Sequence, residues 1–220
     1  MKQTIAIIGA TGTMGSGITR SLAKAGHHIL IAGRDKAKLN ALLTNIKDLM
    51  SNADIDLLDC SREASWEADI IIPAVSYGIQ AEVASRIKDV VTGKIVVSIA
   101  NPLNGTYDGL VTESTTSAAE ELQKLLPHSK VVKAFNSVFA ADFKTPSIGG
   151  KTVDSFVAGD DAQAVAIVAT LVRDAGFNAL IAGGLSVSRT LESMMLLLID
   201  LNMKNNYNWT AGWKVLHDAA

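Results

Sequence analysis

Three glycines and two threonines follow the first apolar run of the chain, where the segment IIGATGTMG leads into a stretch with helical periodicity. Gly9, Gly12 and Gly15 lack side chains, so the backbone can turn tightly and a bulky anion can approach its N–H groups. The N-terminus of the following helix offers unbonded N–H donors and the positive end of its dipole. The residue types therefore predict a pyrophosphate site, in a GxxGxxG spacing one residue longer than GxGxxG. An ordinary strand-to-helix turn is the alternative interpretation.

The second apolar run ends on Gly33 and Arg34, about 20 residues after this loop. A site selective for NAD usually has Asp or Glu at the position of Gly33, where the carboxylate bonds the adenosine ribose and repels a 2′-phosphate. Gly33 leaves that space open, and the Arg34 guanidinium suits a phosphate. Lys36 and Lys38 add positive charge nearby. We therefore predict a preference for NADP(H), the alternative being a solvated, basic start to a helix.

Other candidate ligands follow the later apolar runs, because ligands in such sheets lie beyond the carboxyl ends of the strands. Val75 and Ser76 are predicted to flank the ribose next to the nicotinamide. Asn101 and Pro102 follow the strongest apolar run, and an asparagine amide can bond a ribose or a carboxamide. Plain turn chemistry is the alternative for each of these residues.

No nucleophile–base constellation is present, since the chain lacks GxSxG, HExxH and CxxC. We therefore predict neither a catalytic side chain nor a metal site, and we expect Cys60 to be a minor packing residue. Hydride transfer between two bound rings needs positioning more than a general base. The missing constellation is thus consistent with redox chemistry on a bound dinucleotide.

Apolar runs of strand length alternate with segments of helical spacing, which predicts a Rossmann doubly wound α/β fold with a mainly parallel sheet. The runs are continuously apolar, as in strands covered on both faces. We predict a dinucleotide-binding domain over residues 1–140 and a small C-terminal α/β extension, packed on the same sheet, over residues 141–220. A long helix is expected over Ser186–Met203, with Ser186 or Ser188 as its N-cap.

The composition restricts the partners and the location. The chain has 220 residues, a net charge of −2 and no long basic run, which argues against a nucleic-acid partner. The single cysteine excludes a disulfide framework. The apolar stretch Met194–Ile199 is far shorter than the roughly 20 residues that cross a bilayer. We expect a cytoplasmic protein without a cleaved leader or a membrane partner.

Four segments together resemble a known family: GATGTMGSG, AGR, VVKAFNSVFAADF and LSVSRTLESM. In this order they resemble the NADP oxidoreductases that use the deazaflavin coenzyme F420. They are also similar to the cytosolic NADPH domain of the six-transmembrane epithelial metalloreductases. The resemblance covers nearly the whole chain, and KAFN followed by LSxSRxLE is more specific than the glycine loop.

The resemblance implies three groups of binding residues along the dinucleotide. They are Thr11, Gly12, Thr13 and Met14 at the pyrophosphate, Gly33, Arg34 and Lys38 at the 2′-phosphate, and Val75, Asn101 and Ala134–Asn136 around the nicotinamide. It also implies that the second ring stacks near the loop Asn136–Ala140. The archaeal deazaflavin enzymes usually carry His where Asn136 stands, and the metalloreductase domains match KAFN better.

The leading hypothesis is an enzyme that transfers hydride between NADP(H) and a small-molecule redox acceptor, a deazaflavin or a flavin. The helix over Ser186–Met203 would cover the cleft or pair with a second subunit in a homodimer, or it would bury an ordinary core stripe. One alternative is a dehydrogenase of a small organic substrate such as an imine or a hydroxy acid, for which Lys133 is the nearest proton donor. The other is a non-enzymatic NADPH-binding module that senses redox state.

Overall fold

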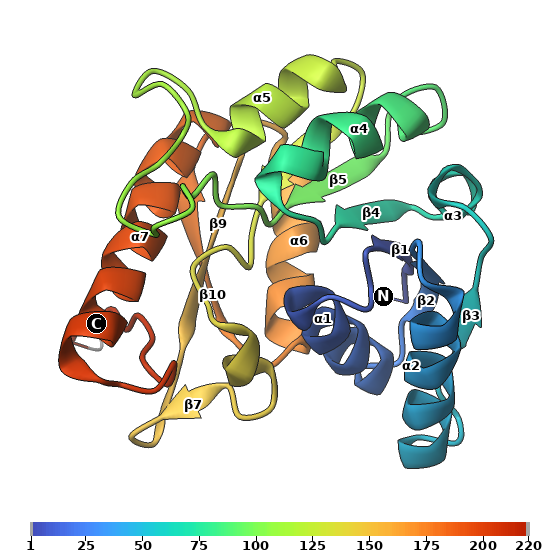
Figure 1. Ribbon diagram of the computed structural model, residues 1–220, viewed down its shortest axis with the longest axis horizontal. Coiled ribbons are helices and arrows are strands. Elements are labelled where there is room, and N and C mark those ends of the chain that lie inside the picture. Colours follow the sequence, from blue (N-terminus) through green and yellow to red (C-terminus); the bar gives the residue numbers. More distant parts are fainter. Residues whose placement is uncertain (1, 219–220) are drawn as a thin grey trace.

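The computed structural model describes residues 2–218, which fold around one eight-stranded sheet (Figure 1). Across the sheet the strands are β10 (Asn178–Gly183), β9 (Asp154–Gly159), β6 (Lys130–Lys133), β5 (Ile95–Ser98), β4 (Ile70–Pro73), β1 (Thr4–Ile8), β2 (His28–Ala32) and β3 (Ile55–Leu57). Strand β1 pairs in parallel with both β2 and β4, so the strand order reverses beside it. The predicted doubly wound fold is confirmed.

The last two strands continue the sheet beyond β6. Strand β9 runs antiparallel to β6, and β10 runs parallel to β9. The sheet is therefore mainly parallel, with one antiparallel pair, and it includes the strands predicted for the C-terminal extension. A division of the chain into two units at residue 140 stays a prediction.

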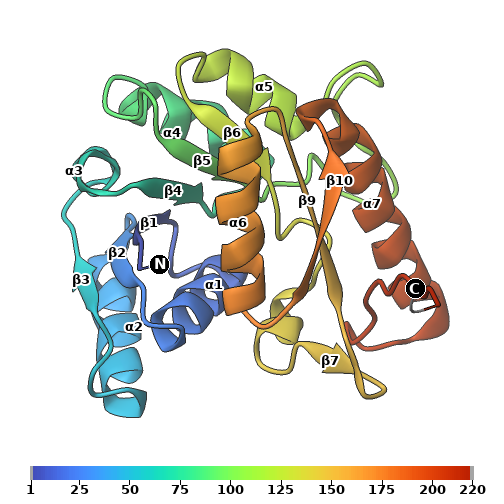
Figure 2. The same cartoon turned by 180° about the vertical axis from the view of Figure 1, so that it is seen from behind.

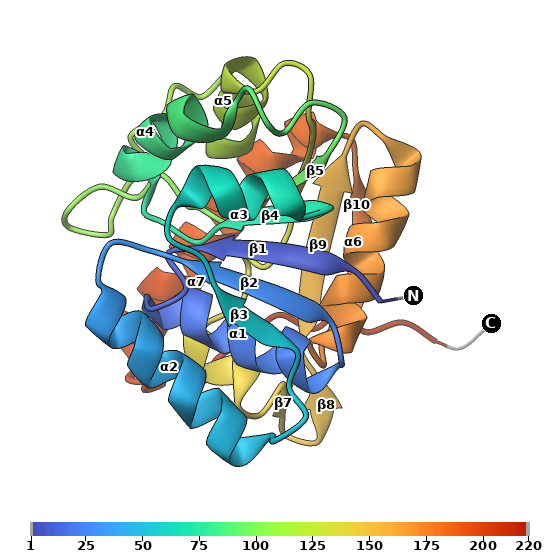
Figure 3. The same ribbon diagram turned by 90° about the vertical axis from the view of Figure 1, so that its right-hand side faces the viewer.

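Helices cover both faces of the sheet, and each face has its own apolar core. One face carries α1 (Thr13–Lys24), α2 (Lys36–Leu49) and α6 (Ala162–Asp174), and the other carries α3 (Ser61–Glu67), α4 (Tyr77–Ile87) and α5 (Ala118–Leu125). Figure 3 shows α3, α4 and α5 above β1 and β2, and α1 and α2 below them. Ile5 and Ile7 belong to the first core, whereas Ala6 and Ile8 belong to the second. Burial on both faces explains why these strands are continuously apolar.

Helix α7 (Ser188–Asn205) lies across β9 and β10 from α6 (Figures 1 and 2). Its residues Met195, Leu198 and Ile199 pack against Phe139 in a third apolar cluster. Of the helices described between residues 2 and 218, none combines the length and the apolar character that crossing a bilayer requires.

The start of α7 differs from the prediction. A 3-10 turn over Leu185–Val187 runs directly into the helix, and the N-cap position is Val187. The prediction of Ser186 or Ser188 as N-cap is therefore wrong. Because the preceding turn is already helical at Val187, with φ −64° and ψ −17°, no extended capping residue is needed.

Two further segments were not predicted from the sequence. Helix α3 went unrecognised because its sequence SREASWE has no apolar period, and Cys60 is its exposed N-cap, whose Sγ accepts a hydrogen bond from the Glu63 N–H at 3.4 Å. The expectation that Cys60 is a packing residue is therefore wrong. The segment at the start of the C-terminal extension contains a 3-10 turn at Ala140–Phe143 and a hairpin of β7 (Ser147–Ile148) with β8 (Lys151–Thr152).

The glycine loop brings α1 unusually close to β1. A Cβ atom at Gly15 would lie 2.3 Å from the Gly9 carbonyl oxygen, and one at Gly9 would lie 2.5 Å from the Ala74 carbonyl oxygen. Gly9 also has a φ of 82°, which only glycine adopts readily. The first and last glycines of the loop are thus required by the backbone itself.

We expect Gly15→Ala to lower the free energy of unfolding by about 1–3 kcal/mol, because the methyl group must push α1 away from β1. The matched control is Gly78→Ala in α4, where a Cβ meets nothing within 4 Å. This control should leave stability unchanged or raise it by up to about 1 kcal/mol. Urea unfolding of the three proteins measures both effects, and equal stability of the two variants would contradict the close-packing account.

Candidate functional site

A cavity of about 940 Å³ opens where the strand order reverses, beyond the carboxyl ends of β1, β2 and β4. Such a crevice is the ligand site expected in an open α/β sheet. Four chain segments and one helix form its wall: Ile8–Gly12, Gly33–Lys38, Asp59–Arg62, Ala74–Ser76, and Ile79, Glu82, Val83 and Arg86 of α4.

The N-terminus of α1 faces this cavity, and no side-chain cap or acidic residue offsets the positive end of its helix dipole. Gly12 is the N-cap and supplies no side-chain acceptor, and the first turn contains no acidic residue. The loop is tied internally, since the Gly12 N–H donates to the Gly9 carbonyl at 3.0 Å. The N–H groups of the first turn and the helix dipole therefore favour an anion at this end of the cavity.

The fold does not require a glycine at position 33, where the cavity wall has an opening. A Cβ at Gly33 would meet only the Leu39 side chain, at an ordinary 3.6 Å, and the backbone of Gly33 is not left-handed. Neither the backbone nor a contact at the Cβ therefore excludes a side chain at this position. Packing therefore does not explain the glycine. Because Gly33 has no side chain, it leaves an uncharged space that a ligand in the cavity can occupy.

The charges around this opening are mostly matched within the protein. Lys36 lies 2.6 Å from Asp59, and the hydrogen bond from Lys36 lowers the pKa of the Asp59 carboxyl. Lys38 lies 3.5 Å from Asp35. Arg34, in contrast, is exposed and forms no ion pair with any residue between 2 and 218. Its guanidinium is thus the cation best available to a bound phosphate.

Two arginines of the cavity wall were not predicted from the sequence. Arg62 on α3 donates through Nε and Nη2 to Asp89, at 3.1 and 2.7 Å, and Arg86 on α4 pairs with Glu82. Arg62 was missed because α3 has no apolar period. Arg62 and Arg86 both line the cavity, and each guanidinium group already has a carboxylate partner.

The structure brings only part of the predicted set to the cavity. The predicted residues that line it are Gly9, Thr11, Gly12, Gly33, Arg34, Lys38, Val75 and Ser76. Outside this lining are Thr13, Met14, Gly15, Asn101, Pro102, Ala134 and Asn136. Gly15 acts through the packing of α1, and Met14 packs against the apolar core. The remaining positions belong to the loops after β5 and β6.

At the ends of β5 and β6 the polar side chains bond to one another. The Asn101 amide donates to the Asn136 carbonyl at 2.9 Å, and the Asn136 amide donates to the Asn101 side chain at 3.0 Å. Ala134 is completely buried, so its methyl group contacts the core. These bonds fix the backbone at the ends of β5 and β6, and the contact of these residues with the nicotinamide stays a prediction.

Two ionisable side chains near these loops are held in hydrogen bonds. The Tyr77 hydroxyl donates to Glu121 at 2.6 Å, which raises the pKa of Tyr77 to about 12. Lys133 is fully buried, and its Nζ lies 2.6 Å from Glu192. Burial lowers the pKa of the Lys133 ammonium, and the Glu192 carboxylate opposes this effect. A buried, paired Lys133 does not reach a substrate.

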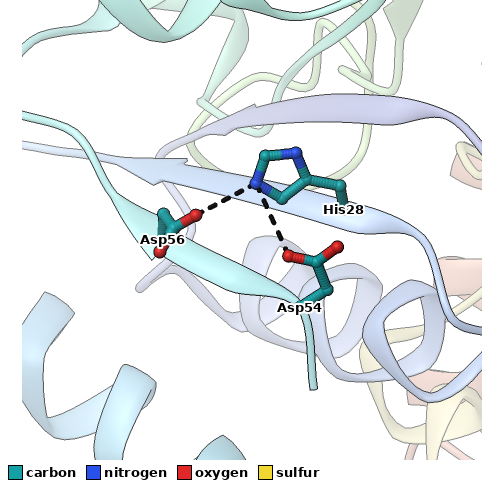
Figure 4. Close-up of side chains that lie close together, drawn as sticks. All are labelled: His28, Asp54 and Asp56. Atoms are coloured by element: carbon teal, nitrogen blue, oxygen red, sulfur yellow. Dashed lines mark hydrogen bonds and ion pairs between the residues drawn. The ribbon is translucent and has the colours of Figure 1, made fainter. Parts of the chain in front are cut away.

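A separate charged group lies at the amino end of β2 and beside β3, away from the cavity. Figure 4 shows His28 with its Nε2 facing Asp56 and Asp54, at 3.0 and 3.7 Å. The Lys2 ammonium also pairs with Asp54. The Lys2 ammonium and the His28 imidazole are the partners of the two carboxylates, so contacts within the protein account for this group.

Comparison with known proteins identifies similar chains. The model of the family described as NADP oxidoreductase coenzyme F420-dependent matches residues 4–102. The chain is 34% identical over 212 residues to the F420-dependent NADP reductase of Methanocaldococcus jannaschii, covering 91% of this chain and 92% of that protein. It is 25% identical to the human Metalloreductase STEAP2, covering 91% of this chain but 37% of that protein.

Solved structures agree with the fold. A putative F420-dependent NADP-reductase from Arthrobacter sp. FB24 matches with a TM-score of 0.79 and 29% identity, covering 93% of this chain and 95% of that one. An imine reductase from Myxococcus stipitatus matches with a TM-score of 0.66 and 15% identity, covering 94% of this chain and 64% of that one. The second similarity is evidence for the fold alone.

We expect Arg34→Ala to weaken the binding of NADPH about tenfold to a hundredfold, because a charge-assisted hydrogen bond of about 1.5–3 kcal/mol is lost. The binding of NADH should change little. Gly33→Asp should weaken NADPH and spare NADH, since the new carboxylate repels only the 2′-phosphate. Fluorescence titration of both dinucleotides gives the dissociation constants.

Arg173→Ala is the matched control for this experiment, because Arg173 is an exposed arginine in the last turn of α6. It should alter neither dissociation constant. Wild-type protein that binds NADH as tightly as NADPH would contradict the role given to Arg34.

Proposed function

The chain belongs to the coenzyme F420-dependent NADP oxidoreductase family, and we propose that it transfers hydride between NADP(H) and coenzyme F420. The observation that carries this proposal is the 34% identity to an F420-dependent NADP reductase along nearly the full length of both chains. The cavity supports it independently, since it combines a helix N-terminus suited to a diphosphate with an arginine suited to a further phosphate.

The proposed orientation of the dinucleotide follows from the positions of these groups. The diphosphate would lie against Gly9–Gly12 at the start of α1, and the adenosine 2′-phosphate would lie beside Arg34. Val75 and Ser76 line the same cavity at the end of β4. The nicotinamide half would then extend toward the carboxyl ends of β4, β5 and β6, because the two halves of a dinucleotide occupy opposite sides of the reversal point.

NADP(H) supplies the hydride or accepts it when bound, and the protein mainly positions the two rings. The ionisable side chains Lys133 and Tyr77 are consistent with a protein that positions the rings and does not itself transfer protons. Lys133 is buried in an ion pair, and the Tyr77 hydroxyl is bonded to Glu121 with a raised pKa. Neither group is poised to give a proton to a substrate at neutral pH.

The alternative of a dehydrogenase for small organic substrates loses its candidate proton donor for the same reason. Lys133 was the nearest donor expected from the sequence, and it is completely buried. The similarity to imine reductases, at 15% identity, concerns the fold and adds no substrate. A non-enzymatic NADPH-binding module is the other alternative, and an activity measurement separates it from the proposal.

The second subunit of the proposed homodimer would pack on the outer face of α7. Leu197 and Leu201 lie one turn apart there and are 48% and 36% exposed, and Met203 is 56% exposed.

We expect light scattering during size exclusion to give twice the monomer mass for the wild-type protein. Combined Leu197→Glu and Leu201→Glu should give monomers, whereas Leu49→Glu on α2 should not. A wild-type monomer at micromolar concentration would contradict the dimer.

The proposed activity predicts that purified protein with NADPH bleaches the visible absorbance of oxidised F420, with one NADPH consumed per F420 reduced. FMN, FAD, a ferric chelate and a quinone should be tested as acceptors beside it. The same preparation carrying Arg34→Ala should show a KM for NADPH raised about tenfold or more. Tight NADPH binding without turnover of any acceptor would instead indicate a non-enzymatic module.

A further inference from the structure

Two oppositely charged side chains are completely buried where β6 ends. The Nζ of Lys133 lies 2.6 Å from Glu192 Oε1 on α7, and it also donates to the Ala100 carbonyl at 2.5 Å. The other oxygen of Glu192 accepts the Ala118 N–H at 3.1 Å, at the start of α5. This pair therefore connects β6, α7, the end of β5 and the first turn of α5.

A second set of buried hydrogen bonds runs beside this pair. The Asn136 amide donates to the Leu191 carbonyl and to the Asn101 side chain, each at 3.0 Å. The Asn101 amide returns a bond to the Asn136 carbonyl at 2.9 Å. Lys133 and Asn136, at the two ends of segment 133–136, thus both bond to α7 and to the loop after β5. We call these six residues the polar clamp: Ala100, Asn101, Lys133, Asn136, Leu191 and Glu192.

The clamp encloses a strained backbone. Phe135 has a φ of 57°, a left-handed conformation that is unfavourable for an aromatic residue. Its ring is fully buried against Phe143 and Phe177, with ring centres 5.8 and 6.5 Å apart. Such strain persists only where the surroundings hold it, and it gathers at functional sites. The left-handed turn ends β6 at Lys133 and sets the path of the following loop.

Stability alone is a weak explanation for the clamp. A buried ion pair loses its hydration, and replacing it with apolar side chains is often neutral or stabilising. The clamp lies instead where positioning matters, at the ends of β5 and β6 on the nicotinamide side of the sheet. Hydride transfer depends steeply on the placement of the reacting atoms, and a displacement of about 1 Å is enough to slow it strongly.

We propose that Lys133 and Glu192 are positioning residues, which hold the loops after β5 and β6 in the conformation that aligns the nicotinamide ring with its hydride acceptor. This inference rests on the proposed function. Neither side chain touches a substrate, since both are buried, so they act through Ala100, Asn136 and the turn at Phe135.

Three variants test this role. Glu192→Gln removes the charge and retains the shape. The double variant Lys133→Met with Glu192→Leu replaces the pair by apolar side chains of similar length. His27→Leu is the matched control, because it breaks another buried polar contact, to Asp174 at 2.9 Å, at the amino end of the sheet.

Four quantities are measured for each protein: the stability to urea, the dissociation constant of NADPH, kcat with F420, and the isotope effect on kcat with NADPH deuterated at C4. We expect both clamp variants to keep NADPH affinity within about twofold, because no clamp residue lines the cavity proposed to hold the phosphates. Their kcat should fall about tenfold or more, with a larger isotope effect as hydride transfer becomes limiting. The double variant should match wild-type stability without regaining kcat, and His27→Leu should lose stability but keep kcat.

Wild-type kcat in the double variant would overturn the inference. If His27→Leu and Glu192→Gln lose equal stability and also lose equal kcat, the inference is wrong. It is also wrong if both clamp variants fail to fold, because the pair would then be needed for the fold itself. Lack of turnover by the wild-type protein would contradict the proposed function instead, so the two failures are distinguishable.

Discussion

The close approach of helix α1 to strand β1 is the constraint on which the rest of the site depends. With only 2.3 Å between the Gly9 carbonyl oxygen and a Cβ at Gly15, the helix can begin directly over the end of the strand. Its first-turn N–H groups and its dipole then point into the crevice between β1 and β4. Because Gly12 gives no side-chain cap and no acid follows it, this positive end remains available to an anion.

The distribution of charge in the cavity supports the proposed preference for NADP(H). Lys36, Lys38, Arg62 and Arg86 all have carboxylate partners within the protein. Arg34 has none among the described residues, and it follows a glycine whose backbone and packing would tolerate a side chain. The combination favours a dinucleotide with an additional phosphate on the adenosine ribose.

Much of this arrangement could be predicted from the sequence. The continuous apolar strands indicated the parallel sheet, and the glycine spacing with Gly33-Arg34 indicated residues that line the cavity, because these signals are local. The roles of residues 133–136 could not be predicted from the sequence.

The left-handed turn at Phe135 leaves no local pattern, and the bonds from Lys133 and Asn136 to α7 join segments more than 50 residues apart. The sequence places Asn101 and Asn136 at the nicotinamide, and this contact stays a prediction, but no local pattern showed that the two residues bond to each other. Helix α3 and its Arg62 were missed because a short polar helix carries no apolar period.

In the proposed arrangement, one half of the molecule recognises the phosphates and the other half aligns the reacting ring. A crystal structure of the protein with NADP⁺ tests this division most directly. The account predicts the diphosphate against the N–H groups at the start of α1, the 2′-phosphate in contact with the Arg34 guanidinium, and the nicotinamide over the ends of β5 and β6. A dinucleotide bound elsewhere, or one whose 2′-phosphate does not contact Arg34, would contradict it.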